Sequence, residues 1–204
     1  MYVTGGRIVG RRPGSIGWWA THDYHRRSME VVDDFCGWDT LLRLVHRADD
    51  KMKKALIATL FETGGRANEV LSLRPTQFSD RGYYISVINM LVLKKRQKNR
   101  RTFPILKTDP LVPFMMDWVE YQREQNEPKL FPYKYDWLYK TVRKIDDDWF
   151  PHRFRAERAT QLAIEHNFNT IDLQNWFGWA RPDMPSEYAK KNVRVLAKKL
   201  RETA

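Results

Sequence analysis

The sequence predicts one mainly α-helical domain with a small antiparallel β-sheet. Apolar residues recur at helical spacing in most segments after about residue 39. Tyr83 to Leu93 is instead rich in Tyr, Ile and Val, which favour strands. Arg101 to Ile105 follows closely enough to return beside it, so we expect a β-hairpin with a charged turn. A chain of 204 residues holds one ordinary domain with a sizeable core and is too short for two of full size.

The first thirty residues differ in composition from the rest. They contain five glycines, the basic pair Arg11-Arg12 and the pair Trp18-Trp19, without helical or strand periodicity. We expect residues 1–30 to form a flexible basic arm and residues 31–204 to form the folded domain.

Two amphipathic helices are expected over residues 39–45 and 52–60. Thr63-Gly64-Gly65 ends the second, and a short helix over 67–73 ends before Pro75. After the hairpin, apolar spacing and Pro or Gly boundaries predict the remaining helices. These cover residues 111–122, 137–145, 154–165, 171–177 and about 185–201.

The balance of charge points to a polyanionic partner. The chain has 36 Lys and Arg against 25 Asp and Glu, a net charge of +11. Double-stranded DNA is the first candidate, because neutralising phosphates supplies most sequence-independent affinity. The alternative is a basic surface that is merely solvated.

Composition also argues against several classes of protein. A single cysteine, Cys36, cannot form an internal disulfide or a Cys-rich zinc site, and no HExxH spacing occurs. No apolar run approaches the roughly 20 residues of a membrane span, and no signal-peptide core is visible. We therefore expect an intracellular, metal-independent protein without a membrane or small-molecule partner.

Four segments stand in a recognisable order. They are Thr63 to Leu73 with Arg66 and Glu69, Lys94 to Ile105, Pro151 to Arg155 with Ala159-Thr160-Gln161-Leu162, and Phe177-Gly178-Trp179 followed nine residues later by Tyr188. Together they resemble the tyrosine recombinase, or phage-type integrase, signature: TGxRxxEL, a lysine-bearing β-turn before R-x-V-P-L, H-x-x-R, and L-G-H or L-G-W before a tyrosine. The match covers roughly residues 38 to 190. The sequence around Tyr188 is similar to that of integrases of archaeal viruses or plasmids.

The resemblance implies metal-independent phosphoryl transfer with no ATP or other cofactor. Tyr188 would be the nucleophile that becomes joined to the 3′-phosphate of DNA. Arg66 and Arg155 would stabilise charge on the phosphate, because planar guanidinium groups bind its oxygens bidentately. A free tyrosine has a pKa of about 10, so its proton must be removed during attack.

His152 is expected to accept that proton or to contact the phosphate; the alternative is a capping or core histidine. Trp179 occupies the position where many family members have a second histidine. Its indole can donate one hydrogen bond but cannot transfer a proton.

The resemblance assigns protonation of the leaving 5′-oxygen to a lysine of the β-turn. Alignment on Pro104 favours Lys95, with Lys94 and Lys98 as alternatives. Glu69, one helical turn from Arg66, would be a supporting carboxylate that orients an active-site side chain; a surface ion pair with Arg66 is the other possibility.

Binding of the DNA backbone is expected from basic residues of the hairpin. These are Lys94, Arg96, Lys98, Arg100 and Arg101. The resemblance also implies a homotetramer on two duplexes, in which the C-terminal helix docks on a neighbouring protomer; alternatively, that helix folds back on its own domain.

Two other functions stay open at this point. A type IB topoisomerase shares the Arg, Lys, Arg and Tyr chemistry, and a non-catalytic relative could bind DNA in a regulatory role. Typical family members carry a separate helical DNA-binding domain before the catalytic one, so the sequence is expected to be either an excised fragment or a natural minimal enzyme.

Overall fold

The computed structural model describes residues 34–94 and 97–179, without the side chains of residues 94, 97 and 98. The predicted N-terminal arm, the predicted helix at 185–201 and Tyr188 therefore lie outside the described residues. The same is true of Lys95 and Arg96.

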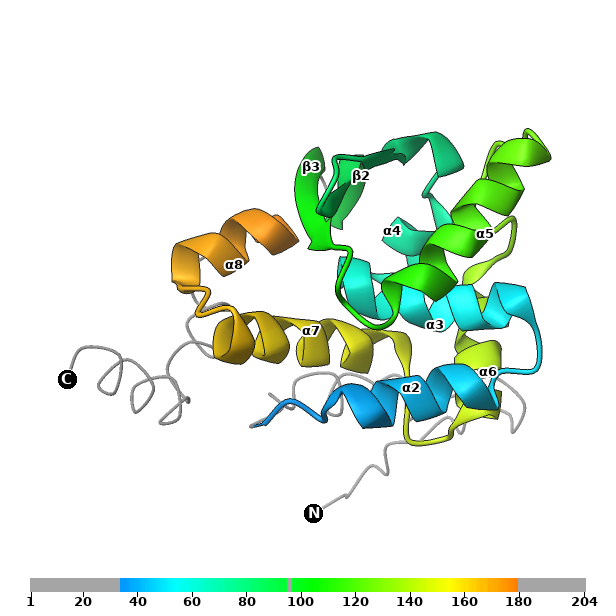
Figure 1. Cartoon of the computed structure of the whole chain (residues 1–204), viewed down its shortest axis with the longest axis horizontal. Helices are drawn as coiled ribbons and strands as arrows, with labels where there is room; N and C mark the ends of the chain where they lie inside the picture. The colour runs from blue at the N-terminus through cyan, green and yellow to red at the C-terminus, as the bar shows by residue number, and fades with distance from the viewer. Residues whose placement is uncertain (1–33, 95–96, 180–204) are drawn as a thin grey trace, which may run out of the picture. The chain divides into compact units, whose positions relative to one another are not determined.

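Helices and one three-stranded sheet make up the described part of the chain (Figure 1), which confirms the predicted fold class. Element labels follow Figure 1. The helices are α2 (Trp38–Arg47), α3 (Lys51–Thr63), α4 (Ala67–Leu71), α5 (Val112–Glu124), α6 (Tyr135–Ile145), α7 (Pro151–Glu165) and α8 (Thr170–Phe177), with a 3-10 turn, η1 (Pro75–Gln77). The strands are β1 (Phe78–Asp80), β2 (Tyr84–Lys94) and β3 (Gln97–Leu106). No helix among the described residues is both long and apolar enough to cross a membrane.

Helix α3 is the central element of the core. Every residue from Ala55 to Thr63 is buried, so apolar side chains on all of its faces pack against neighbouring elements. The Asp50 side chain accepts a hydrogen bond from the Lys53 N–H at 2.7 Å and fixes the start of the helix. Gly64, with φ of 53°, ends it in the left-handed conformation that glycine adopts without strain. Helices α2, α5 and α7 pack against it.

The sheet is antiparallel in the order β1-β2-β3. Tyr84 pairs with Leu106 at one end of the hairpin and Lys94 with Gln97 at the other, so only residues 95 and 96 connect the strands. The basic stretch predicted as a turn is therefore mostly strand. Charged residues fit there because alternate positions of β3 face opposite sides of the sheet. Strand β1 was not predicted, since three residues are too few for a visible alternation.

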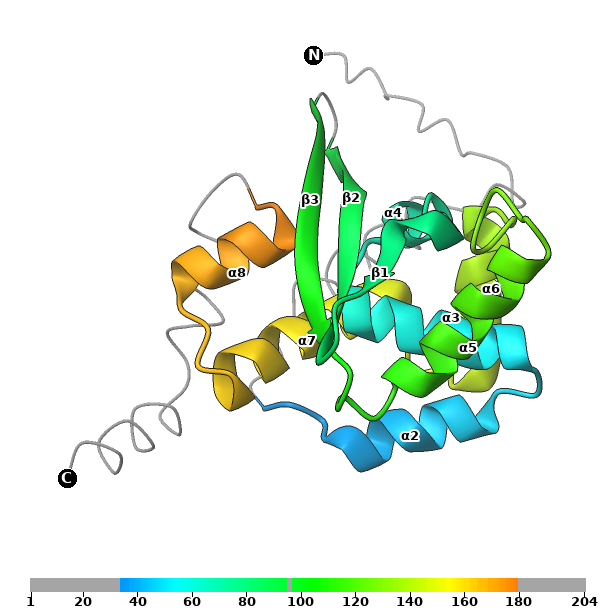
Figure 2. The same ribbon diagram turned by 45° about the horizontal axis from the view of Figure 1, so that its top comes forward.

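The hairpin stands upright in Figure 2, with α8 beside β3 and α4 on the side of β2. Trp176 of α8 packs against Phe103 of β3, with ring centroids 4.9 Å apart. This contact places the end of α8, and Trp179 after it, next to the inner face of the sheet.

A group of buried charges lies where the C-terminal part of α3 meets the middle of α7. Arg158 is 1% exposed, and both of its terminal nitrogens lie 3.0 Å from Asp109 Oδ2. Glu62 Oε2 lies 3.2 Å from Arg158 Nη2, yet neither Glu62 oxygen has a hydrogen-bond partner among the described residues. Burial, together with the nearby Asp109, raises the pKa of Glu62 to about 8 even though Arg158 opposes the shift.

We predict that Glu62→Gln makes the free energy of unfolding less dependent on pH between about 5 and 8. The raised pKa means that folded Glu62 keeps its proton while the unfolded chain, with a pKa near 4.5, releases it. Its contribution to stability is thus fully present below pH 4.5 and is lost as pH rises toward 8. The slope for one such group is at most about 1.4 kcal/mol per pH unit.

Urea unfolding at pH 5, 6.5 and 8 measures this difference. The gain in stability of Glu62→Gln over wild type should grow with pH, whereas Glu120→Gln on the exposed face of α5 should follow wild type. A constant difference at all three pH values would show that Glu62 is ionised in the folded protein.

Candidate active site

Arg66 occupies the N-cap position of α4 and is tied to Glu69, one turn later. The Arg66 backbone N–H donates to Glu69 Oε2 at 3.0 Å, and its Nη1 donates to Oε1 at 2.7 Å. The Arg66 side chain is 32% exposed, while that of Glu69 is fully buried. The buried Glu69 therefore fixes the position of the Arg66 side chain, and the exposed part of that side chain remains accessible to a ligand.

Glu69 links three elements. Besides Arg66, it accepts a hydrogen bond from the Leu93 N–H of β2 at 3.1 Å, and its Oε2 lies 3.7 Å from Nη1 of Arg155 on α7. A completely buried side chain with these contacts does not fit the alternative of a surface ion pair.

Burial by itself would raise the pKa of Glu69, but the positive charges of Arg155 and Arg66 and the Arg66 N–H outweigh it and bring the pKa below its ordinary value. The carboxylate is thus ionised near neutral pH and attracts both guanidinium groups.

Arg155 lies deeper than Arg66, with only 3% of its side chain exposed. Its Nη1 donates to the Gly64 carbonyl at 2.7 Å and its Nη2 to the Phe177 carbonyl at 3.3 Å. The guanidinium carbon is 4.7 Å from the centre of the Phe177 ring and 5.3 Å from that of Trp179. Arg155 thereby joins the C-terminal ends of α3 and α8 to Glu69.

His152 and Trp179 lie near this group. His152 is half-buried in the first turn of α7, three residues before Arg155, a spacing that puts both on one helix face. Trp179 is 8% exposed, and its ring stacks on Phe177 with centroids 4.6 Å apart. The structure therefore brings together Arg66, Glu69, Arg155, His152 and Trp179.

The hairpin lysines are only partly described. Lys94 and Lys98 are placed as strand residues of β2 and β3, without their side chains, and Lys95 lies between the paired positions 94 and 97. The hydrogen bond from the Leu93 N–H to Glu69 fixes β2 two residues before Lys95.

Arg100 and Arg101, which were both expected to bind the DNA backbone, have different environments in the structure. Arg100 is exposed, whereas Arg101 is 5% exposed on the face of β3 that carries the buried Phe103 and Ile105. Its guanidinium donates to the carbonyls of Thr63, at 2.9 Å, and of Trp176. Burial lowers the pKa of Arg101 to about 10. The expectation that Arg101 contacts the DNA backbone is therefore corrected, because strand alternation turns it inward.

A close approach at Gly64 was also missed from the sequence. A Cβ at this position would lie 2.4 Å from Cε1 of Phe177. At Gly178, with φ of 64°, a Cβ would lie 2.8 Å from Cγ2 of Val92. The signals were present as the Gly-Gly and Phe-Gly-Trp motifs, but contact between them depends on the tertiary fold.

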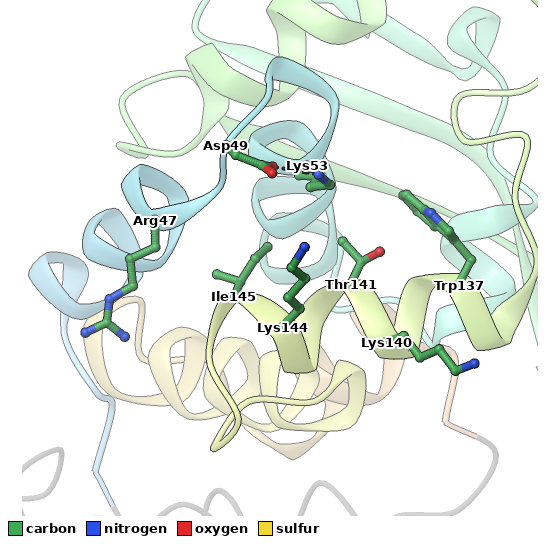
Figure 3. Close-up of a pocket in the computed structure, with 8 residues that line it drawn as sticks. All are labelled: Arg47, Asp49, Lys53, Trp137, Lys140, Thr141, Lys144 and Ile145. Carbon is green, nitrogen blue, oxygen red and sulfur yellow. Dashed lines mark hydrogen bonds and ion pairs between the residues drawn. The ribbon is translucent and has the colours of Figure 1, made fainter.

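A pocket of about 380 Å³ lies at the other end of α3 (Figure 3). Arg66 follows the C-terminal end of α3, whereas the pocket lies at the N-terminal end. The 13 residues of α3 span roughly 20 Å. Two of the four basic residues in the lining already form ion pairs, Lys53 with Asp49 and Arg47 with Asp146. We therefore do not place the chemistry there. The lining consists of Arg47, Asp49, Lys53, Trp137, Lys140, Thr141, Lys144 and Ile145.

Three neighbouring carboxylates lie between α6 and α7. Oxygen atoms of Asp146, Asp147 and Asp148 approach within 4.8 Å of one another. Asp146 is paired with Arg47, and the other two are exposed. No other observation points to a cation, so we assign no metal site to them.

Comparison with known proteins identifies the family. The sequence profile of the phage integrase family matches residues 38–194. The chain belongs to the phage integrase family. It is 30% identical over 157 residues to the tyrosine recombinase XerA of Saccharolobus solfataricus, an alignment that covers 75% of this chain and 49% of XerA. The chain thus spans about half the length of this curated relative.

Solved structures of family members share the fold. A crystal structure of a XerA recombinase superposes with a TM-score of 0.63 at 16% identity, over 83% of this chain and 64% of XerA. The catalytic domain of bacteriophage HP1 integrase gives 0.54 at 20% identity, over 82% of this chain and 94% of that domain. The described helices and sheet thus have the fold of tyrosine recombinase catalytic domains.

We predict that Gly64→Ala destabilises the protein more than Gly82→Ala. Both glycines have positive φ, which costs a residue with a Cβ about 1–2 kcal/mol. A Cβ at Gly82 meets nothing within 4 Å, so this variant measures the backbone cost alone. A Cβ at Gly64 also collides with Phe177, and thermal unfolding of the two variants should differ accordingly. Equal losses would mean that Phe177 moves aside at no cost.

Proposed function

We propose that this chain is the catalytic domain of a site-specific DNA recombinase that cuts and rejoins strands through a 3′-phosphotyrosyl intermediate. The observation that carries the proposal is the pairing of Arg66 and Arg155 with one buried carboxylate, Glu69. Two guanidinium groups held by a shared anchor form a preorganised site for a phosphodiester. Family membership over residues 38–194 supports the same reaction.

In the proposed cleavage step, the Tyr188 oxygen attacks the phosphorus and the bond to the 5′-oxygen breaks. The tyrosine proton passes to His152 or to solvent, and Lys95 donates a proton to the departing 5′-oxygen. Arg66 and Arg155, with Trp179 as a further donor, stabilise charge on the non-bridging oxygens. A 5′-hydroxyl from a second duplex then reverses the step, so the energy of the phosphodiester is kept without ATP or another cofactor.

The DNA would be held along the hairpin. Lys94, Arg96, Lys98 and Arg100 are the proposed backbone contacts. In sequence, the basic arm at residues 1–30 precedes the catalytic domain at 31–204 and is proposed as an additional DNA-binding segment. A structure of XerH bound to its difH substrate, which shares the fold, supports duplex DNA as the ligand. A homotetramer on two duplexes, with the C-terminal helix docked on a neighbour, completes the proposal.

We predict that wild-type protein forms a covalent adduct with a nicked suicide duplex carrying the attachment site, and that Tyr188→Phe does not. The variant should keep its DNA affinity within about twofold, because the hydroxyl is a nucleophile and not a binding anchor. A denaturing gel measures the adduct, and a gel-shift assay measures the affinity.

The suicide-duplex assay, together with an assay on supercoiled DNA, separates the rival functions. An adduct that persists in Tyr188→Phe would falsify the assignment of the nucleophile. Relaxation of supercoiled DNA without strand exchange would indicate a topoisomerase. Specific DNA binding by wild type without any adduct would indicate a non-catalytic DNA-binding protein.

We predict that Arg66→Lys slows adduct formation by about 10²–10³-fold, or roughly 2.7–4 kcal/mol, by analogy with loss of one oxyanion donor. An ammonium group keeps the charge but cannot bond both Glu69 and a phosphate in the guanidinium geometry. Single-turnover rates measure the loss, and Arg43→Lys on the exposed face of α2 is the matched control. A rate within threefold of wild type for Arg66→Lys would exclude Arg66 from the phosphate clamp.

A further inference from the structure

We propose that Arg101 is a positioning residue that, together with Arg155, holds the C-terminal ends of α3 and α8 in one frame, and so fixes the segments that carry Arg66 and Trp179. This inference rests on the proposed recombinase function. It concerns a residue whose side chain is buried.

Arg101 and Arg155 bind consecutive carbonyls of the same two helix ends. Arg101 donates to the carbonyls of Thr63 and Trp176. Arg155 donates to the next carbonyl in each case, at Gly64 and Phe177. The two arginines come from different elements, β3 and α7, yet they form the same pair of connections one residue apart.

The chemistry of the helix ends explains why cations are found there. The last carbonyls of a helix lack partners within the helix and carry partial negative charge. Gly64 and Gly178 end α3 and α8 in the left-handed conformation. Both guanidinium carbons lie near the Phe177 ring, at 5.8 Å for Arg101 and 4.7 Å for Arg155.

The geometry requires an arginine. One guanidinium spans two carbonyls on separate helices with Nη1 and Nη2, while its Nε has no hydrogen-bond partner among the described residues. A lysine at this position would have a single nitrogen, which cannot bond both carbonyls in the same planar arrangement. The function of Arg101 therefore depends on the planar guanidinium with its two donor nitrogens, and not only on the positive charge.

The position of this connection links it to the proposed chemistry. Arg66 follows Thr63 by three residues, and Trp179 follows Trp176 by three residues. A shift at either carbonyl would therefore be transmitted to the clamp at Arg66 or to the chain that continues from Trp179 toward Tyr188. Arg155, which bonds the adjacent carbonyls, would be displaced as well.

Hydrogen exchange tests the connection without requiring activity. The variants are Arg101→Met, which removes the donors but keeps most of the volume, and Arg101→Lys. Leu138→Ala, a fully buried site on α6, serves as a control of comparable stability loss. In both Arg101 variants, amides at residues 60–66 and 174–179 should exchange at least fivefold faster, whereas those of α5 should not. Leu138→Ala should not produce this paired change.

The rate of adduct formation on the nicked duplex tests the consequence. Arg101→Met should react at least tenfold more slowly than wild type while its DNA affinity stays within about twofold, and Arg101→Lys should not recover the rate. If Arg101 acts through Arg155, the loss should shrink to less than threefold in an Arg155→Lys background. Leu138→Ala should react at the wild-type rate at a temperature where all variants are folded.

Two results would overturn the inference. The first is faster exchange confined to the hairpin, or a change at only one of the two helix ends. The second is full recovery of rate and exchange by Arg101→Lys, which would show that a buried charge suffices. If wild type forms no adduct at all, the proposed function fails, while the paired exchange at the two helix ends still decides whether Arg101 connects them. If Arg101→Met does not fold, the comparison rests on Arg101→Lys.

Discussion

The described structure around the candidate site depends on one buried carboxylate. Glu69 is completely removed from solvent, so its negative charge must be compensated by neighbours. Arg66, Arg155 and the Leu93 N–H supply that compensation from α4, α7 and β2. The same contacts that make the buried charge tolerable therefore align two guanidinium groups and the hairpin. Loss of Glu69 would leave two cations next to each other without the anion that holds them.

A second constraint is the meeting of two helix ends. α3 and α8 both end at a glycine with positive φ, and Phe177 of α8 packs against Gly64 at the end of α3. This close packing brings unpaired carbonyls from both helices into one small volume. Arginines from β3 and α7 are the groups that satisfy them, since each presents two parallel donors. The motifs proposed to be catalytic, which are far apart in sequence, meet because these helix ends meet.

Much of the fold could be predicted because the signals were local. Apolar spacing located the described helices to within a few residues, and Gly64 and Gly178 marked two of their ends. The boundaries of the hairpin were less accurate, because Lys98 and Arg100 suggested a turn although alternate strand positions accept charges. Strand β1 depends on pairing with β2 and has no local signal of its own.

The sequence proposed which residues form the site, but it did not reveal their environment. Motif order indicated Arg66, His152, Arg155 and Trp179 as partners, and the structure brings these four together. That Glu69 contacts both Arg66 and Arg155, and that Arg101 faces the core, depends on the pairing of the hairpin with the helices. Alternation puts Arg101 on the same strand face as the apolar Phe103 and Ile105, but the sequence did not show that the strand extends back to Arg101 until its pairing with β2 was known.

The two arginines of the clamp are not equivalent, and this difference decides how their substitution should be interpreted. Arg155 is almost completely buried and uses its donors on carbonyls of α3 and α8 as well as lying near Glu69. Replacing Arg155 would alter both the packing of these helix ends and the proposed phosphate site. Arg66 bonds only Glu69 among the contacts described for its guanidinium, and a third of its side chain is open to solvent. A loss of activity at Arg66 therefore reports on the chemistry more directly than the same loss at Arg155, where folding and catalysis depend on the same donors.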